Sequence, residues 1–277
     1  MSDSPATPTY HAELMAFAYW MTGCVTDSED IVQEVLANWY AGEQAHVADA
    51  KRYLAKAVKN RCLSWLQRRA PRRGTYLPEP LVHPVPALDA KLDLSFGLWL
   101  LLAELAPLER AVFLLKDGFG FDYEDLAHML EVRADYCRQL YHRAGQHLQA
   151  RRQRFTPSAE QQHRLLQAFG HAIETGDLAA LTQLLRHDVR VYADGGPKRP
   201  AAMHPVVGPA ACARYLLGIQ QKYGQGLTSR LGRVNDSWAV LFYRNRPEAL
   251  DSVMVLELDA ACITALYLVL DPDKLPR

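Results

Sequence analysis

Two segments of the chain carry dense positive charge. Residues 51–73 hold nine Lys or Arg and no Asp or Glu, and residues 133–154 hold six Arg against a single acid, Asp135. The whole chain of 277 residues has no net charge, with 31 basic and 31 acidic side chains. Because nucleic-acid binding requires only local neutralisation of phosphates, these two blocks predict contacts with a nucleic-acid backbone in spite of the neutral total.

A second set of candidates is acidic or aromatic and lies in the C-terminal half. Asp194, His204, Tyr192 and Tyr243 could line a pocket in which a carboxylate of raised pKa abstracts a proton. No spacing among these residues fixes an acid–base pair. The tripeptide that begins at Asp194, Asp-Gly-Gly, is also typical of a turn, in which Asp caps and Gly supplies a positive φ. We therefore predict no catalytic residues.

The five cysteines are scattered and never form a CxxC pair. This pattern argues against a disulfide framework or a zinc site and favours reduced thiols in a cytoplasm. We predict no metal and no cofactor. The N-terminus lacks a basic segment followed by an apolar one, and no apolar run approaches the length of a membrane span, so neither a secretory signal nor a membrane contact is expected.

The first basic block falls on a predicted amphipathic helix. Apolar residues recur there at helical spacing, with the cations between them; they are Tyr53, Leu54, Ala57, Val58, Cys62, Trp65 and Leu66. This spacing places Tyr53 and Trp65 in the core, not on a surface that stacks on bases. In the helix before it, Thr26 and Glu29 have the spacing of a capping box.

Prolines at 78, 80, 84 and 86 predict an extended linker and a domain boundary. Helical pattern resumes near Leu92 and runs to Leu105, and Pro107 suits the first turn of the next helix. Asp122 can then cap a short helix that ends near Met129. A tight turn and a long basic helix follow, which together predict a helix-turn-helix.

The composition changes after residue 157. Helical pattern occupies about 160–185, a strand begins at 189, and another helix covers 209–219. Four β-rich runs follow, at 227–234, 238–244, 252–258 and 262–270. Helices followed by a curved antiparallel sheet predict an α+β domain with its own core.

Several of these segments resemble extracytoplasmic-function (ECF) sigma factors that carry a SnoaL-like C-terminal extension. Two segments resemble sigma region 2, AYWMTGCVTDSEDIVQEVLANWY and RYLAKAVKNRCLSWLQRRAPRR. One segment resembles sigma region 4, LAELAPLERAVFLLKDGFGFDYEDLAHMLEVRADYCRQLYHRA. Three short motifs, YLPEPL, YADGGPK and DPDKL, occur in the order found in that subgroup. The resemblance covers nearly the whole chain.

The resemblance implies a multidomain fold. Two all-α sigma domains, a region 2 helical bundle (1–73) and a region 4 helix-turn-helix (92–154), would be joined by a Pro-rich linker (74–91). A cone-shaped α+β domain of the SnoaL-like/NTF2-like kind would follow at 160–277. The expected partners are core RNA polymerase, through the clamp helices of its largest subunit and its flap, and promoter DNA. No separate anti-sigma protein would be required.

The resemblance also assigns roles to residues. The polymerase clamp helices would be contacted by Asp27, Glu29, Asp30 and Glu34, although the same pattern is typical of a solvated acidic helix N-terminus. The melted −10 strand would be held by Lys51, Arg52, Lys56, Lys59, Arg61, Arg68 and Arg69. The −35 element would be read by Arg133, Tyr136, Arg138, Gln139, His142 and Arg143. A regulatory contact between the extension and the linker would involve Leu77, Pro78, Glu79 and Pro80 with Asp194, Gly195, Gly196 and Lys198.

The chain departs from the family pattern at several positions. Arg133-Ala134 stands where Ser-Glu usually begins the recognition helix, and Ala106 stands where Ser or Thr caps the Pro107 helix. Each lost cap costs around 1 kcal/mol. Pro197 replaces a usual glycine, and the segment 235–238 replaces an Asn-Gly turn. Two other functions stay open: a SnoaL-type isomerase or small-molecule-binding protein with a helical tether, and a regulator that uses only its helix-turn-helix.

Overall fold

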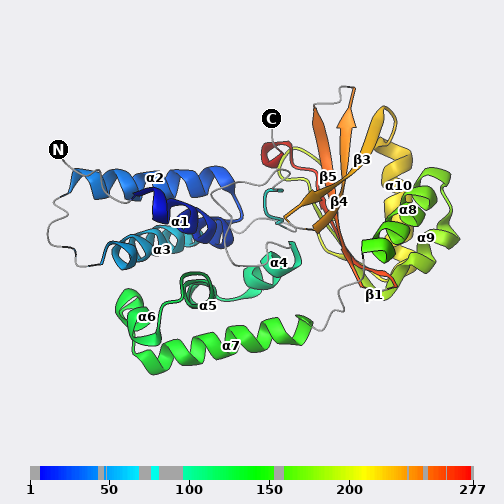
Figure 1. Ribbon diagram of the computed structural model, residues 1–277. Coiled ribbons are helices and arrows are strands. Elements are labelled where there is room, and N and C mark those ends of the chain that lie inside the picture. Colours follow the sequence, from blue (N-terminus) through cyan, green and yellow to red (C-terminus); the bar gives the residue numbers. More distant parts are fainter. Residues whose placement is uncertain are drawn as a thin grey trace. The chain divides into compact units, whose positions relative to one another are not determined.

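The computed structural model describes residues 7–42, 47, 49–68, 76–80, 96–152, 159–235, 237–245, 249–259 and 261–275. The chain divides into two compact units (Figure 1). The first unit comprises Met1–Pro71 and Pro84–Arg152, so that both helical halves expected from the sequence belong to one body. The second comprises Arg72–His83 and Gln153–Arg277, and it therefore includes the Pro-rich segment 76–80.

The first unit is built around α1 (Thr7–Thr22), whose residues 14–21 are all buried. Helices α2 (Val25–Ala41) and α3 (Ala50–Arg68) pack against α1 and against each other. The predicted capping box at Thr26 is wrong, because Cys24 is the N-cap and its Sγ accepts from Asp27 N at 3.4 Å. Gly23, with φ of 73°, ends α1 and reverses the chain, which starts α2 one residue before Thr26.

The rest of the first unit contains α4 (Phe96–Glu104), α5 (Pro107–Phe119), α6 (Tyr123–Leu130) and α7 (Ala134–Arg152). Pro107 occupies the first turn of α5 and Asp122 caps α6 by accepting from Asp125 N at 2.7 Å, so both predictions are confirmed. The missing cap at Ala106 is compensated in part, since Glu109 Oε2 accepts from Ala106 N at 3.4 Å.

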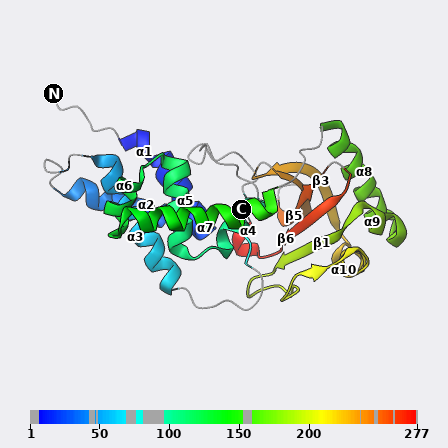
Figure 2. The same ribbon diagram turned by 90° about the horizontal axis from the view of Figure 1, so that it is seen from below.

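The second unit is an α+β domain. Its helices are α8 (Ala159–Thr175), α9 (Leu178–Leu184) and α10 (Pro209–Tyr223). Its strands are β1 (Leu185–Asp194), β2 (Val206–Val207), β3 (Leu227–Val234), β4 (Ser237–Arg244), β5 (Leu250–Leu258) and β6 (Ile263–Val269), followed by the 3₁₀ helix η3 (Pro272–Lys274). Figure 2 shows the three helices along the sheet, and residues of all three join the strands in one apolar core.

The strands form one sheet in the order β2-β1-β6-β5-β4-β3. The expected antiparallel sheet is correct for four of the five neighbouring pairs, but β1 and β6 run parallel. The sequence pattern could not reveal this pairing, because α10 and four strands separate β1 from β6 along the chain. Among the described residues, no helix is both long and apolar enough to cross a membrane.

Candidate nucleic-acid interface

Six cations of the first basic block lie on α3, namely Lys51, Arg52, Lys56, Lys59, Arg61 and Arg68. The predicted Arg69 lies outside the described residues. The helix buries one apolar stripe that includes Leu54, Val58 and Cys62. Most of the cations sit beside this stripe, so the sequence expectation of one packed face and one charged face holds for α3.

Most cations of α3 have partners within the first unit. Lys51 Nζ lies 2.9 Å from Glu13 Oε2, and Arg61 Nη2 lies 2.7 Å from Glu34 Oε1. Arg68 Nε donates to Ser64 O of its own helix at 3.2 Å. Three further cations, Arg52, Lys56 and Lys59, face α6 and the turn that follows it.

The contact between α3 and α6 combines two ion pairs and a buried hydrogen bond. Arg52 pairs with Asp125, and Lys56 Nζ lies 2.9 Å from Glu131 Oε1. Lys59 is buried and donates to Met129 O at 3.0 Å. Burial lowers the pKa of Lys59, and the neighbouring Lys56 lowers it further. The hydrogen bond and charge of Lys56 in turn lower the pKa of Glu131.

Tyr53 is an exception to the predicted core of α3. Its side chain is 49% exposed and its ring centroid lies 5.2 Å from that of Trp39 on α2. The prediction that Tyr53 is a core residue is wrong, because the buried stripe begins one residue later at Leu54, about 100° further round the helix. An exposed aromatic ring therefore stands between the cations Arg52 and Lys56.

The helix-turn-helix is formed by α6 and α7. Glu131 takes the left-handed conformation, with φ of 57°, and ends α6. Helix α7 buries Cys137, Leu140, Ala144 and Leu148. All six residues predicted to read DNA are exposed: Arg133, Tyr136, Arg138, Gln139, His142 and Arg143. The exposed side of the helix thus carries the donors and acceptors suited to base edges and phosphates.

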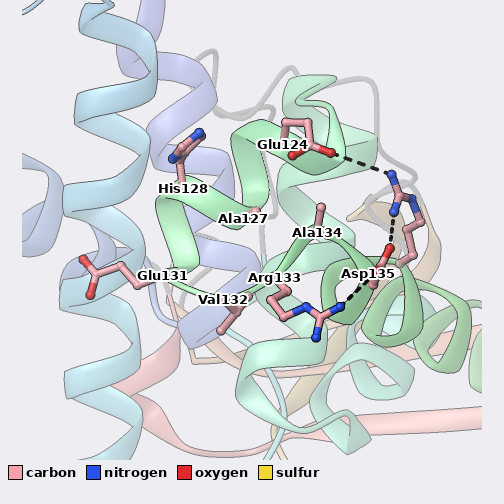
Figure 3. A pocket seen from close by; sticks show the side chains of 9 residues that line it. Glu124, Ala127, His128, Glu131, Val132, Arg133, Ala134 and Asp135 are labelled. Carbon is pink, nitrogen blue, oxygen red and sulfur yellow. Dashed lines mark hydrogen bonds and ion pairs between the residues drawn. The ribbon is translucent and has the colours of Figure 1, made fainter.

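Carboxylates hold the arginines at the start of α7. Asp135 lies 2.5 Å from Arg138 Nη1 and 3.4 Å from Arg133 Nη2, and Glu124 Oε1 lies 3.8 Å from Arg138 Nη2. The Arg138 guanidinium also lies 5.3 Å from the ring centroid of Tyr123. Figure 3 shows Glu124, Arg133 and Asp135 around a surface hollow between α6 and α7. Asp135 is noted in the sequence only as an acid within the basic block, and Glu124 was not predicted.

The acidic residues predicted for polymerase binding lie on the N-terminal half of α2. Glu29, Asp30 and Glu34 are exposed and Asp27 is partly buried in the first turn. Buried residues on the other side of α2, such as Ile31 and Val35, pack into the first unit. An acidic surface is thereby left available to a partner, and only Glu34 has an ion pair in the described part of the chain, with Arg61.

In the second unit, Asp194 joins the end of β1 to the Pro-rich segment. Asp194 is 4% exposed, and its Oδ2 accepts from Leu77 N at 2.8 Å and from Lys274 Nζ at 2.5 Å. Lys274 also donates to Leu77 O, and its ammonium lies 3.3 Å from the ring centroid of Tyr76. Leu77 is fully buried, and Pro78 and Pro80 are buried beside it. We call Asp194, Lys274 and the segment 76–80 the linker clamp.

The turn predicted at Asp194 is present, because the other carboxylate oxygen, Oδ1, accepts from Gly196 N at 3.0 Å. A Cβ on Gly195 would lie 2.0 Å from Arg199 O, and one on Gly196 would lie 2.1 Å from Asp271 Oδ2. Both glycines are therefore required for the loop to approach its neighbours this closely. Lys198, in contrast, forms an exposed ion pair with Asp273 at 2.5 Å.

Comparisons with known proteins agree with this arrangement of helices. Residues 9–72 match the model of Sigma-70 region 2, and residues 96–148 match that of Sigma-70, region 4. The chain is 31% identical to the ECF RNA polymerase sigma factor SigJ of Mycobacterium tuberculosis, over 94% of this chain and 89% of SigJ. The chain belongs to the ECF sigma factors.

Further comparisons extend the similarity to the α+β domain of this ECF sigma factor. The probable ECF RNA polymerase sigma factor SigI of Mycobacterium tuberculosis is 27% identical over 98% of this chain and 94% of its own length. The crystal structure of SigJ superposes with a TM-score of 0.77 at 28% identity, covering 96% of this chain and 95% of that one. The fold predicted for the whole chain, two helical sigma domains followed by a SnoaL-like domain, is confirmed.

In this sigma factor the residues considered for acid–base chemistry do not gather around a free carboxylate. Asp194 is occupied by Leu77, Lys274 and Gly196, and His204 is exposed. Tyr192 stacks on Tyr267 with 5.3 Å between ring centroids. Tyr243 lies on β4, and β6 and β5 separate that strand from β1. The described geometry therefore offers no support for proton abstraction at Asp194.

Proposed function

We propose that this ECF sigma factor brings core RNA polymerase to promoters through α2, binds the melted −10 strand through α3, and reads the −35 element through α7. The arrangement of α7 carries the proposal, because five exposed polar or aromatic residues lie on the second helix of a helix-turn-helix and exposed Arg133 directly precedes it. The cationic helix α3 belongs to the same compact unit. The protein would act in the compartment of the polymerase and would catalyse no reaction of its own.

Contacts to the two promoter elements would differ in kind. On α7, Arg138 and Arg133 suit guanine edges and Gln139 suits adenine, so that this helix supplies sequence preference. On α3, cations beside the exposed ring of Tyr53 suit a single strand, in which phosphates meet positive charge and an unpaired base meets an aromatic face. Arg61 and Arg68 lie in the C-terminal half of α3, where they could extend the phosphate contact.

The linker clamp would make the α+β domain a regulator of the sigma domains without a separate anti-sigma protein. The segment 76–80 lies between α3 and α4 in the chain, so any force on it acts on the connection between the two DNA-binding helices. The clamp holds this segment through a buried ion pair and two backbone hydrogen bonds. Formation or release of the clamp would then change how far α3 and α7 can separate on a promoter.

The decisive experiment is run-off transcription by core polymerase on a pool of genomic promoter fragments, with and without the full-length chain. New transcripts that begin at a shared −35 and −10 spacing are expected. An Arg133→Ala/Arg138→Ala variant should lose those transcripts while it still binds core polymerase. Equal transcription with and without the chain, from a preparation that binds core enzyme, would contradict the proposal.

A further inference from the structure

Within the first unit, three cations of α3, namely Arg52, Lys56 and Lys59, are occupied by groups of the helix-turn-helix. We propose that α6 and its C-terminal turn form an autoinhibitory clasp on α3, in which carboxylates of the protein take the places of promoter phosphates. This inference rests on the proposed function of α3 in binding the −10 strand. It concerns a different contact from the linker clamp, since Asp194, Lys274 and segment 76–80 take no part in it.

The clasp is held at both ends of α6. Asp125 in the first turn pairs with Arg52, and Glu131 at the C-terminal cap pairs with Lys56. Figure 3 shows Glu131 directed away from Arg133 and Asp135, on the other side of the turn. The acids of this region therefore divide into two sets. Glu124 and Asp135 hold the arginines at the start of α7, whereas Asp125 and Glu131 hold α3.

Lys59 lies between these two ion pairs in a less accessible position. It is 5% exposed, and its ammonium donates to Met129 O in the last turn of α6. The last carbonyls of a helix lack partners within the helix and carry partial negative charge, which favours a cation there. The groups that face Lys59 are thus Met129 O and the Glu131 carboxylate from α6, and Lys56 from α3 itself.

The same cations cannot serve DNA and the clasp together. A phosphate that approached Arg52 or Lys56 in this arrangement would meet Asp125 or Glu131, and like charges at such distances repel. Lys59 would also have to leave its buried position. Binding of a nucleic-acid strand along this part of α3 therefore requires that α6 move away, and α6 carries the rest of the helix-turn-helix with it because α6 packs against α7.

The clasp can be tested on the full-length chain with isosteric amides. An Asp125→Asn/Glu131→Gln variant removes both carboxylates but keeps every cation of α3. A Glu160→Gln/Glu174→Gln variant is the matched control, since it makes the same change in net charge at two exposed positions of α8 in the other unit. A labelled random-sequence single-stranded DNA is the probe, because phosphate contacts do not depend on sequence.

We expect the Asp125→Asn/Glu131→Gln variant to bind this probe roughly 2- to 30-fold more tightly than the matched control, the range given by two partly exposed ion pairs. The gain should shrink as salt is raised, because salt screens the clasp in the wild-type chain. Equal affinity of the variant and the control at low salt would overturn the proposal.

A second measurement follows the clasp without DNA or polymerase. The rate at which an amine-reactive acylating reagent modifies Lys59, read by mass spectrometry, should rise several-fold in the Asp125→Asn/Glu131→Gln variant, while the rate at Lys222 should not change. If Lys59 were acylated in the variant no faster than in the wild-type chain, the clasp would be overturned even if DNA binding increased. Absence of run-off transcripts with the wild-type chain would instead remove the proposed function, and Lys59 labelling would still report on the clasp.

Discussion

Arg110 on α5 donates from Nη1 to Met21 O on α1 at 2.8 Å, although 89 residues separate the two along the chain. Its Nε donates to Leu102 O on α4 at 2.7 Å. Both of these acceptors are neutral carbonyls, and burial of the guanidinium beside them lowers the pKa of Arg110 to about 10. One side chain thereby ties the helices of region 4 to the central helix of region 2.

Replacement of Arg110 should therefore loosen the first unit. Arg110→Met keeps the length of the side chain but removes the donor to Met21 O and one of two donors to Leu102 O, which still accepts from Leu105 N at 3.1 Å. Loss of a donor to a buried carbonyl costs about 1–3 kcal/mol. We expect the free energy of unfolding to fall by about 2 kcal/mol or more in thermal or urea denaturation. Arg164→Met, at an exposed position on α8, is the control and should change stability by less than about 0.5 kcal/mol. An Arg110→Met variant as stable as that control would show that the carbonyls find other partners.

Tyr53 should contribute to promoter opening through its ring. Loss of one base-stacking contact costs about 1–3 kcal/mol, so Tyr53→Ala should reduce open-complex formation roughly 5- to 150-fold. Tyr53→Phe should keep most of the activity because the aromatic face remains. Permanganate reactivity of the −10 thymines measures opening directly. If Tyr53→Phe lost as much activity as Tyr53→Ala, the hydroxyl and not the stacking surface would be responsible.

The linker clamp can be separated from the turn that Asp194 caps. Lys274→Met removes the ion pair and the bond to Leu77 O, but leaves the hydrogen bond between Asp194 Oδ1 and Gly196 N in place. We expect transcription from a cognate promoter to change roughly 5- to 150-fold, the range of a coupling of 1–3 kcal/mol. Lys198→Met, which breaks the exposed pair with Asp273 in the same region, should leave transcription near the wild-type value.

Stability must be measured on the same two variants. A regulatory clamp predicts that Lys274→Met alters transcription per folded molecule, whereas a purely structural one predicts activity that falls only with the folded fraction. Circular dichroism melting, combined with transcription at a temperature where both variants are folded, decides between these outcomes.

The pH dependence of the α+β domain should reflect Asp251. Burial would raise the pKa of this carboxyl, but hydrogen bonds from Arg244 and Arg199 outweigh burial and hold the pKa below its usual value. Because the folded-state pKa is depressed, the contribution to stability is complete above the unfolded value of about 3.9 and is lost as the pH falls through the folded-state pKa. The stability difference between wild type and Asp251→Asn, measured by thermal denaturation, should be constant from pH 7 to about 5. Below about pH 4 it should shrink, and a difference that grew in acid would contradict this assignment.

Sequence patterns located most of the elements because their periodicity is local. The stripe on α3, the cap at Asp122, the turn before α7 and the strands β3 to β6 all follow from neighbours a few residues apart. Exposure of Tyr53 was missed because a helical pattern fixes the edge of a buried stripe only to within one residue. Trp39, which flanks Tyr53, belongs to another helix.

The contacts on which the two proposals rest were harder to predict because they join distant residues. Lys274 lies 80 residues from Asp194 and 197 from Leu77, so that only the DPDKL motif marked its position, without a partner. Similarly, the cations of α3 could be counted in the sequence, but nothing local indicates that Asp125 and Glu131 neutralise two of them. Tertiary pairing decides which charges of a basic block are available.

Burial of Leu77 in the second unit has a consequence for exchanging modules between paralogous sigma factors. The second unit is discontinuous in the gene, because it includes the pentapeptide 76–80, which is encoded between sigma regions 2 and 4. A chimera joined only near residue 153 would pair a foreign α+β domain with a native pentapeptide and leave Leu77 without its matched surroundings. Residues 76–80 should therefore be exchanged together with Asp194 and Lys274 when such a chimera is made.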